Sequence, residues 1–582
     1  MGAGVLHLVD TLPSGGGVCA HYETGRRPND AWVEADVRAR CHRHQTEWGR
    51  ALIDWHARMI SEAAAVNASA WLLPGSRLHV WQPQIRPLLF ALGLCDFFSD
   101  HPRDTVWAVG CPPEVGEYVE DLLRGRVAVR RSQAAARHWR ERVRAVVGPL
   151  RDTVSVLRRL PVRARLPVRA DRCDVLVYSL ALSERSVSEV GDHFFGRALD
   201  DASLKVQWLY QVMGSRDRLR VQHAIDQTGR AVAWAHDSVG WAGALPLLWQ
   251  ARALRRSLRR YRERVPPLAM KWGASRAFAR RFVDEELIGG GILNELTVLR
   301  ATTQLVAAYQ PKAVCFPYEE KGVEHAIVQA ARAAGCRAIG FAHAAYGAGY
   351  LYLAESDTNA PRPDALVSAG EGFDGWLHHT FGRDVRSTFV GSPRWNAPSE
   401  NHTAHEPGQP LRVLVLISFA YELTMMAEWM AAQPDMFAGM HVVVRPNPKD
   451  WQREQASAFA GLRGTTSITV DTQSSLQTQL DACDVAVFCA TSAVAEAIWR
   501  GRIAIYAQWN DLWVTNPIDG KAGAEAVPHC DTAAVLRSEL LRVAGMTAAE
   551  YTAVVAAQQP VAAQVYGPFD IARFRHATMG PE

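Results

Sequence analysis

Short runs of β-branched and other apolar residues alternate along the chain with segments whose apolar positions recur at helical spacing. A strand, a helix and a second strand form the repeating unit of a parallel sheet covered on both faces, so this alternation predicts an α/β protein. The strands predicted in the first two thirds of the chain are residues 5–9, 106–109, 127–129, 175–179, 206–210, 231–235, 313–316, 338–341 and 365–367.

A polar stretch rich in Pro, His and Glu, residues 398–410, interrupts this pattern before a fresh strand begins. The strands predicted after it are 411–417, 441–444, 467–470, 485–488 and 503–506, with a helix at 493–500. We therefore expect two Rossmann-like lobes with a deep cleft between them and an N-terminal extension. The expected parts are an α/β N-terminal region with basic helices (1–172), packed on or part of the first lobe, then a first lobe (173–397), a linker (398–410) and a second lobe (411–582).

Composition agrees with a large globular protein. The 582 residues are 48% hydrophobic and 21% charged, which supports more than one α/β core. No apolar run approaches the roughly 18–20 residues of a membrane span, and the first residues lack the layout of a secretory signal, so we expect a cytoplasmic protein. The ten cysteines are scattered without a C-x-x-C pair, which favours buried free thiols over disulfides or a metal site.

Positive charge is concentrated in two segments, 130–172 and 252–281, although the net charge is only +4. Apolar residues at helical spacing, such as Leu254, Leu258 and Tyr261, predict basic amphipathic helices. Such helices either lie on the anionic surface of the inner membrane, which would make the protein peripheral, or form a solvated arginine-rich face. Nucleic acid is not an expected partner, because aromatic residues are not interleaved with these charges.

The segment 314–350 places acidic residues and a histidine at two strand ends. Glu319 and Glu320 follow a predicted strand, Glu324 lies on the next helix, and His343 ends the following strand. Ligands of open α/β sheets bind at this edge, where a carboxylate can take a proton and an imidazole can position a sugar or phosphate. Two alternatives remain open: the glutamates complement a helix dipole, or His343 is a satisfied buried side chain.

Two further segments suggest a phosphate site in the second lobe. Arg445 and Asn447 lie in a proline-rich turn directly after the strand 441–444. Thr491 and Ser492 occupy the position of a helix N-cap, with Glu496 about one turn later. Backbone N–H groups and hydroxyls there favour a nucleotide phosphate, and Glu496 suits ribose hydroxyls. The alternative is a plain N-cap with a solvent-facing glutamate.

These segments, PYEEKGVE with FAH, then VGSPRW, RPNP and ATSAVAEA, resemble the bacterial capsule and lipopolysaccharide biosynthesis proteins of the glycosyltransferase B class. The resemblance covers residues 173–506 and includes similarity to Kdo- and sialyl-type transferases. It departs at Asn447, which stands where those transferases have the histidine of their HP motif; an amide supplies hydrogen bonds only. No D-x-D motif is present, so a metal-independent site is expected, without a cofactor.

The resemblance implies a nucleotide-sugar donor bound by Arg445, Asn447, Thr491, Ser492 and Glu496, and a glycan or lipid-linked acceptor bound by the first lobe. Glu319 is then the expected base, with Glu324 as its substitute and His343 beside them. Two other functions stay open. One is a nucleotide-sugar epimerase of the same architecture, and the other is a catalytically inactive scaffold of a polysaccharide assembly complex.

Overall fold

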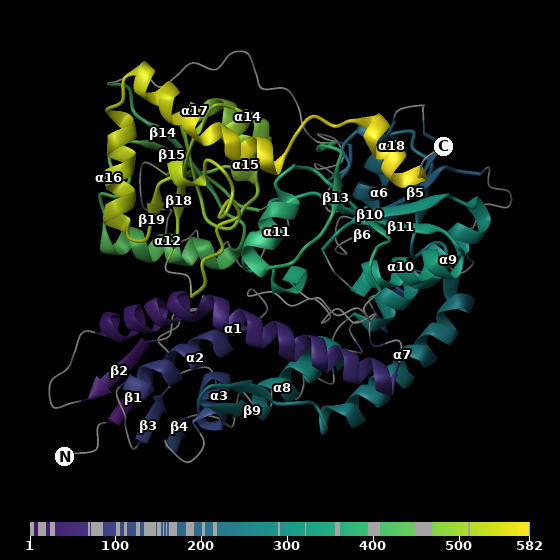
Figure 1. Cartoon of the computed structure of the whole chain (residues 1–582), viewed down its shortest axis with the longest axis horizontal. Coiled ribbons are helices and arrows are strands. Elements are labelled where there is room, and N and C mark those ends of the chain that lie inside the picture. Colours follow the sequence, from purple (N-terminus) through teal and green to yellow (C-terminus); the bar gives the residue numbers. More distant parts are fainter. Residues whose placement is uncertain are drawn as a thin grey trace.

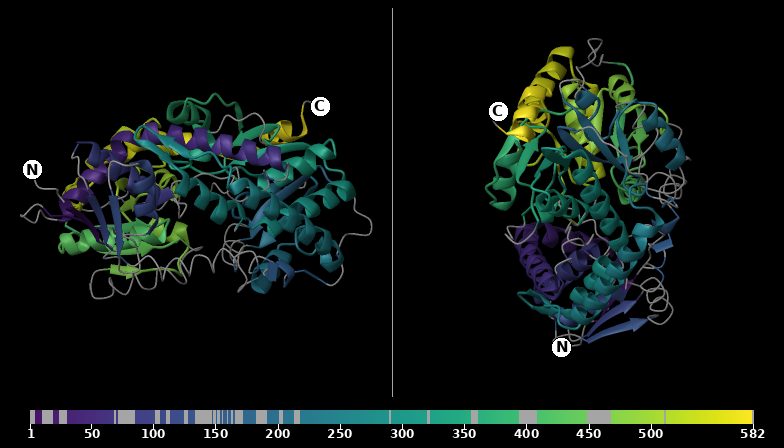
Figure 2. Two further views of the ribbon diagram at one scale, coloured as in Figure 1. Left: turned by 90° about the horizontal axis from the view of Figure 1, so that it is seen from below. Right: turned by 90° about the vertical axis from the view of Figure 1, so that its right-hand side faces the viewer.

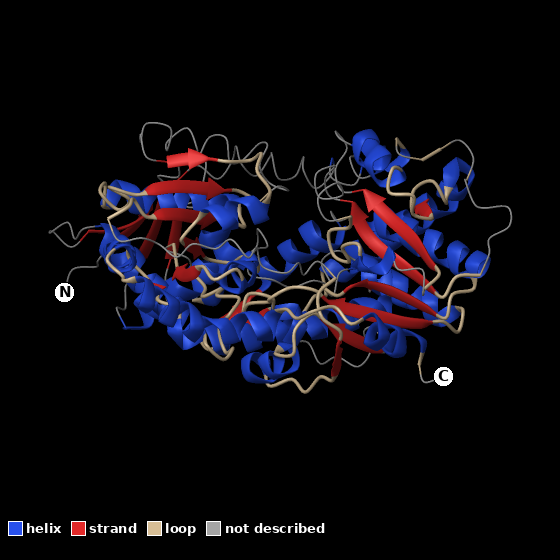
Figure 3. Ribbon diagram, turned by 90° about the horizontal axis from the view of Figure 1, so that it is seen from above, coloured by secondary structure: helices blue, strands red, loops and turns tan. Residues whose placement is uncertain are grey.

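The computed structural model describes most of both lobes and parts of the N-terminal region. The described residues are 5–9, 19–23, 30–67, 70, 85–100, 105–109, 113–123, 128–132, isolated positions between 147 and 164, 172–181, 191–200, 204–212, 218–288, 291–319, 322–354, 361–393, 408–447, 468–509 and 512–580. They form an α/β structure with two large parallel sheets, as the sequence predicts. Figure 3 shows the strands of these two sheets in separate halves of the molecule, with helices around each.

The N-terminal region has its own sheet, in the order β2-β1-β3-β4. The strands are β1 (Val5–Val9), β2 (Cys19–Glu23), β3 (Thr105–Val109) and β4 (Ala128–Ser132), and only the β1–β2 pair is antiparallel. The helices are α1 (Asp30–Val66), α2 (Ile85–Asp100) and α3 (Pro113–Leu122). Arg130 and Arg131 belong to β4, so the predicted basic helix 130–172 is wrong at its start. Most of that segment lies outside the described residues.

The first lobe is built on a seven-stranded sheet in the order β13-β12-β11-β10-β5-β6-β7, with every pair parallel. The strands are β5 (Val175–Ala181), β6 (Val206–Val212), β7 (Val232–Trp234), β10 (Ala313–Pro317), β11 (Arg337–Ala342), β12 (Ala365–Ser368) and β13 (Ser387–Phe389). Read from β7, the order along the chain is 3-2-1-4-5-6-7, the Rossmann arrangement with one extra strand. Every residue of β5 and β10 is buried, which explains their continuous apolar runs.

Helices cover this sheet and connect it to the N-terminal region. They are η3 (Ala198–Asp200), α6 (Arg218–Asp226), α7 (Gly240–Arg262), α8 (Arg276–Phe282), the π-helix η4 (Val283–Ile288), α9 (Ile292–Tyr309), α10 (Gly322–Ala333), η5 (Leu351–Ala354) and α11 (Phe373–Phe381). A hairpin of β8 (Leu268–Met270) and β9 (Gly273–Ser275) separates α7 from α8. The basic segment 252–281 is therefore two helices and a hairpin rather than one helix.

The second lobe has a six-stranded parallel sheet in the order β16-β15-β14-β17-β18-β19, or 3-2-1-4-5-6 along the chain. Its strands are β14 (Arg412–Leu416), β15 (His441–Arg445), β16 (Ile468–Val470), β17 (Val485–Phe488), β18 (Ile503–Ala507) and β19 (His529–Cys530). Its helices are α12 (Ala420–Ala432), α14 (Leu476–Ala482), α15 (Ala493–Trp499), η6 (Ala524–Ala526), α16 (Ala533–Ala544) and α17 (Ala548–Val565). All five strands predicted here are confirmed, and among the described strands of this lobe β19 alone was not predicted.

The last helix, α18 (Ile571–Met579), returns to the first lobe (Figure 1). It contacts β10, β12 and β13, and the Arg337 guanidinium donates a hydrogen bond to the carbonyl of Thr578 (3.3 Å). A bridge between Ser392 and Pro568 precedes it. Helix α18, which the sequence places in the expected second lobe (411–582), therefore packs on the first lobe. The expected linker 398–410 lies mostly outside the described residues.

Helix α1 contacts both lobes, as its course in Figures 1 and 2 suggests. On the first-lobe side, the Trp55 indole donates to the carbonyl of Pro266 (2.7 Å). On the second-lobe side, the backbone N–H of Val514 donates to the Gln45 side chain (3.0 Å), and Gln508 contacts His42 (2.8 Å). The N-terminal region is thus connected to both lobes by hydrogen bonds of α1.

Two expectations about the whole chain can be compared with the structure. All eight cysteines whose side chains the structure describes are buried and free, which confirms the expected buried thiols for these eight. None of the described helices combines the length and the apolar character that a membrane crossing requires.

Candidate functional site

The strand order of each lobe marks one place where ligands bind. In both sheets the order reverses between two neighbouring strands: β5 and β10 in the first lobe, β14 and β17 in the second. In open α/β sheets, the crevice outside the carboxyl ends of these strands is the binding site. Glu319 follows β10 by two residues, and Thr491 and Ser492 follow β17 by three and four. Glu319, Thr491 and Ser492 therefore lie at the two switch points.

Glu319 and His343 come together at the first-lobe switch point. The Glu319 carboxylate lies 3.6 Å from Nε2 of His343, and their side chains are 15% and 8% exposed. The Phe194 ring covers the imidazole edge-on, with centroids 4.6 Å apart. Phe194 is held by Asp192, which accepts its backbone N–H (2.9 Å). A shielded carboxylate next to an imidazole is suited to proton transfer.

Glu324 holds the backbone of Glu319 in place. Its carboxylate accepts the backbone N–H of Glu319 (2.7 Å), and its side chain is buried in the first turn of α10. Glu324 therefore fixes the loop that carries Glu319, and the catalytic roles of both glutamates stay predictions. The third acidic residue of this motif, Glu320, lies outside the described residues.

Two tyrosines that sequence reasoning missed surround the pair. The Tyr346 hydroxyl donates to the carbonyl of Tyr318 (2.7 Å), directly before Glu319. The Tyr178 hydroxyl donates to Gln211. Burial raises the pKa of both phenols well above the usual value, and the charges of Glu319 and Glu324 raise it further. Both therefore remain neutral donors. No sequence motif marked either tyrosine, because a tyrosine within an apolar run cannot be distinguished from an ordinary core residue.

The predicted phosphate-facing arginine is engaged with protein groups. Arg445 donates through Nη1 to the carbonyl of Ser474 (2.9 Å) and to Oε1 of Gln479 (2.6 Å). These bonds fasten the end of β15 to the start of α14. Asn447, two residues beyond β15, is partly exposed, and the residues from 448 to 450 lie outside the described part. That Arg445 and Asn447 bind phosphate stays a prediction.

The loop after β17 agrees in part with the predicted N-cap. Ser492 is the N-cap residue of α15, but its side chain makes no capping hydrogen bond. The Thr491 hydroxyl instead accepts the backbone N–H of Ala493 (3.2 Å). Glu496 lies in the first turn, and Thr491, Ser492 and Glu496 are all partly exposed. Their side chains are thus accessible at the switch point, although α15 has only seven residues.

A buried glutamate on the other side of this switch point was also missed. Glu422, fully buried in the first turn of α12, accepts the backbone N–H of Ser418 (2.9 Å), just after β14. The arrangement repeats that of Glu324 and Glu319 in the first lobe. In both lobes a buried carboxylate thus holds a switch-point loop by one of its backbone N–H groups.

The two switch points are linked through Thr515. Its hydroxyl lies 3.7 Å from Sγ of Cys489, the residue after β17. Its carbonyl approaches Gly347 so closely that a Cβ there would lie 2.5 Å from the oxygen. Gly347 follows His343 by four residues. The His343 loop and the β17 loop therefore meet at the junction of the lobes.

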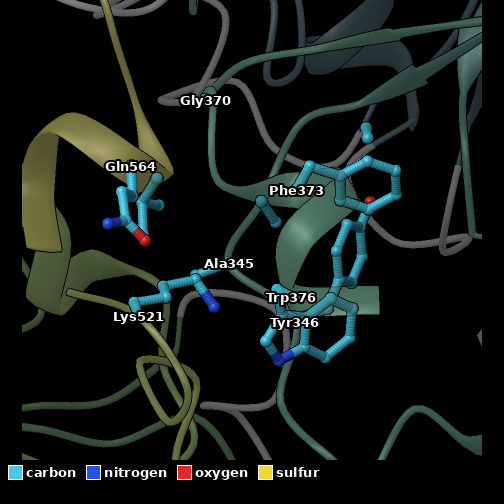
Figure 4. A pocket seen from close by; sticks show the side chains of 10 residues that line it. Ala345, Tyr346, Gly370, Phe373, Trp376, Lys521 and Gln564 are labelled. Carbon is cyan, nitrogen blue, oxygen red and sulfur yellow. The ribbon is translucent and has the colours of Figure 1, made fainter. Parts of the chain in front are cut away.

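A pocket at this junction contains a buried lysine (Figure 4). Lys521 is 5% exposed, donates to the carbonyl of Pro517 (2.9 Å) and lies 5.0 Å from the centre of the Trp376 ring. Burial lowers the pKa of its ammonium to about 7, although Asp519 acts in the opposite direction. No cluster of three or more His, Cys, Asp or Glu side chains that suits a metal ion occurs within the described ranges.

Comparisons with known proteins give weak structural likenesses. No family model matches the sequence, and no curated protein matches it. Among solved structures, MurG of Acinetobacter baumannii is 12% identical, with 69% of this chain and 98% of that chain covered and a TM-score of 0.39.

Two further solved structures give similar values. The UDP-GlcNAc 2-epimerase of Neisseria meningitidis, bound to UDP-GlcNAc, is 8% identical over 67% of this chain and 96% of that chain (TM-score 0.40). The glycosyltransferase SnogD of Streptomyces nogalater is 13% identical over 67% and 95% (TM-score 0.38). A likeness at this level assigns no activity.

Proposed function

We propose that this chain is a glycosyltransferase of the B class, which transfers a sugar from a nucleotide-sugar donor to the hydroxyl of an acceptor. The observation that carries the proposal is the shielded Glu319–His343 pair, 3.6 Å apart, at the switch point of one Rossmann-like sheet. The switch point of the second sheet adjoins it through Thr515. Two such crevices facing one junction suit a reaction between two bound substrates.

In this reaction Glu319 takes the proton of the acceptor hydroxyl while that oxygen forms a bond to the anomeric carbon of the donor. The bond from this carbon to the phosphate oxygen breaks, and its electron pair leaves with the nucleotide. His343 orients the carboxylate, and the backbone bond to Glu324 keeps Glu319 in place. The neutral hydroxyl of Tyr346 fixes the same loop by its hydrogen bond to the carbonyl of Tyr318.

The donor binds mainly to the second lobe in this proposal. The hydroxyls of Thr491 and Ser492 face the phosphates, Glu496 binds the ribose, and Asn447 donates hydrogen bonds from the end of β15. Arg445 offsets the negative charge that develops on the leaving phosphate, without a metal ion. Thr491 and Ser492 follow β17 at the switch point, and Arg445 and Asn447 lie at the same edge of the sheet, at the end of β15. These positions and the partial exposure of the side chains support the roles.

A binding and turnover experiment tests the proposal. Thermal shifts with CMP, UDP, GDP and TDP identify the nucleotide, because a ligand of the native state raises its apparent stability. The matching nucleotide sugar is then incubated with and without acceptors. Release of free nucleotide only with an acceptor supports transfer, whereas isomerisation of the donor alone would establish the epimerase.

The acceptor is proposed to be a glycan or lipid-linked intermediate of surface polysaccharide synthesis, reached at the inner membrane. Helix α7 supports this part. Trp241, Leu245 and Trp249 recur every four residues on one face and are 48%, 59% and 70% exposed. Exposed arginines follow on the same helix at positions 252, 256, 259 and 260. Tryptophan and arginine on one amphipathic helix suit an anionic membrane surface.

Sedimentation with liposomes tests the membrane contact. We expect the protein to sediment with anionic and not with neutral liposomes, and less at 1 M salt, where the Debye length is about 3 Å. The variant Trp249→Ala should bind more weakly, whereas Leu541→Ala, which replaces an apolar residue of α16 that is 48% exposed, should bind like the parent protein. Protein that stays in the supernatant at low salt refutes the contact.

A further inference from the structure

The loop of residues 191–196, here called the Asp192 loop, lies at the same switch point as Glu319. It belongs to the connection from β5 to β6, whereas Glu319 follows β10. β5 and β10 are the two neighbouring strands between which the order of the first sheet reverses. Because a ligand binds in the crevice outside the carboxyl ends of such a pair, the loops after both strands border it. The Asp192 loop is therefore expected to border the crevice that contains Glu319.

Hydrogen bonds anchor the Asp192 loop to the sheet. The buried carboxylate of Asp192 accepts two backbone N–H groups of its own loop (2.9 and 2.7 Å) and the hydroxyl of Ser179 in β5 (2.7 Å). The guanidinium of Arg230 donates to the carbonyls of Gly191 (3.0 Å) and Gly196 (2.7 Å), the first and last residues of the loop. A loop anchored at both ends and in its middle presents its side chains in fixed directions.

His193 is the accessible side chain of this loop. Every other residue from 191 to 196 is buried, and His193 is partly exposed. Its ring meets the Phe194 ring edge-on, with centroids 4.7 Å apart, and the same phenyl ring covers His343 at 4.6 Å. Phe194 thus contacts both imidazoles, and His343 in turn lies 3.6 Å from Glu319. A partly exposed imidazole, which can donate or accept a hydrogen bond, is therefore fixed one ring away from the Glu319–His343 pair.

We propose that His193 binds the acceptor sugar, through a hydrogen bond between its imidazole and a hydroxyl other than the one that gives its proton to Glu319. The inference rests on the proposed function, because it takes the acceptor as the ligand of this crevice. The hydroxyls of a sugar project from different sides of its ring, so one molecule can contact His193 and Glu319 together. Two such contacts determine which hydroxyl faces the base, and His193 is therefore a specificity-determining residue.

Transfer kinetics of the full-length protein test this role. The donor is the nucleotide sugar whose nucleotide binds, and the acceptor probes are the methyl glycosides of glucose, galactose and N-acetylglucosamine. The variant His193→Phe keeps a ring against Phe194 and removes both nitrogens. The variant His193→Gln removes the ring and keeps a group that forms hydrogen bonds. The control is His223→Ala, which removes an exposed histidine of α6 in the same lobe.

The three variants should differ in the KM for the acceptor. We expect His193→Phe to raise this KM roughly tenfold, because it loses one hydrogen bond to the substrate. Its kcat at saturating acceptor and its nucleotide affinity should stay close to those of the parent protein, since the bond is made before and during the reaction alike. His193→Gln should recover part of the loss, and His223→Ala should equal the parent protein.

Three results would overturn the inference. The first is an unchanged acceptor KM in His193→Phe. The second is a larger loss in His193→Gln than in His193→Phe, which would give the imidazole a packing role against Phe194. The third is a parent protein that binds nucleotide and releases none with any of the three glycosides. Nucleotide binding, measured separately, distinguishes the two proposals: a parent protein that binds no nucleotide refutes the glycosyltransferase, and the role of His193 is refuted with it.

Discussion

The buried ammonium of Lys521 makes a quantitative prediction about stability. Its pKa is about 7 in the folded protein, against 10.5 for an ordinary lysine. Between these values the unfolded chain binds more protons than the folded one, so stability rises with pH across this window. At about 1.4 kcal/mol per pKa unit, the charged form costs up to about 5 kcal/mol below pH 7, and roughly half of that remains at pH 9.

Replacement by methionine removes this cost together with two favourable contacts. The hydrogen bond to Pro517 and the contact with the Trp376 ring contribute about 1 kcal/mol each. Lys521→Met should therefore be more stable than the parent protein at pH 6.5 by a few kcal/mol, about 3 at most. By pH 9 the difference should shrink to nearly zero. Asp519 of the same loop and His379, whose ring lies against Gly520, are ionisable groups near this site, and both remain in the variant.

Urea unfolding at pH 6.5, 7.5 and 9 measures this effect. A chain of this size is not expected to unfold in one step, so transition midpoints of the two proteins are compared at each pH. The control variant is Lys312→Met, because Lys312 is exposed. Its transition midpoint should equal that of the parent protein at every pH. The reasoning is refuted if Lys521→Met is the less stable protein at pH 6.5, or if its advantage does not decline as the pH rises.

Three further predictions concern the donor site and the junction of the lobes. Ser492→Ala combined with Glu496→Ala should weaken nucleotide binding at unchanged circular dichroism; equal calorimetric affinity would remove these residues from the donor site. Gly370→Ala places a Cβ against the carbonyl of Gln564 in the other lobe, so turnover and the unfolding midpoint should both fall; an unchanged midpoint would contradict the close junction. Excess chelator should leave turnover intact, and a strict divalent requirement would contradict the metal-independent mechanism.

The sequence predicted the two lobes well because their central strands are buried on both faces. The continuous apolar runs of β10 and β17 can be recognised without knowledge of their neighbours. Strand β4 was harder, because Arg130 and Arg131 lie in an edge strand whose pairing with β3 no local pattern reveals. The return of α18 to the first lobe likewise depends on contacts between distant segments.

The candidate site was predictable where it depends on strand ends and not where it depends on loop packing. Glu319 and His343 follow adjacent parallel strands, so their proximity follows from the order of elements. The hydrogen bond from Glu319 to Glu324 and the partners of Arg445 depend on side-chain conformations that spacing does not fix. Lys521 was missed because its burial results from the packing of two lobes rather than from its own segment.

Acceptor-dependent release of nucleotide distinguishes a glycosyltransferase from the other candidate functions. The parent protein and Glu319→Gln are incubated with the nucleotide sugar whose nucleotide binds, with and without acceptor, and free nucleotide is measured. The account predicts release by the parent protein only when an acceptor is present, and a loss of roughly 100-fold or more in Glu319→Gln with unchanged nucleotide affinity. Full activity of Glu319→Gln, or nucleotide binding without release for every acceptor, would contradict it.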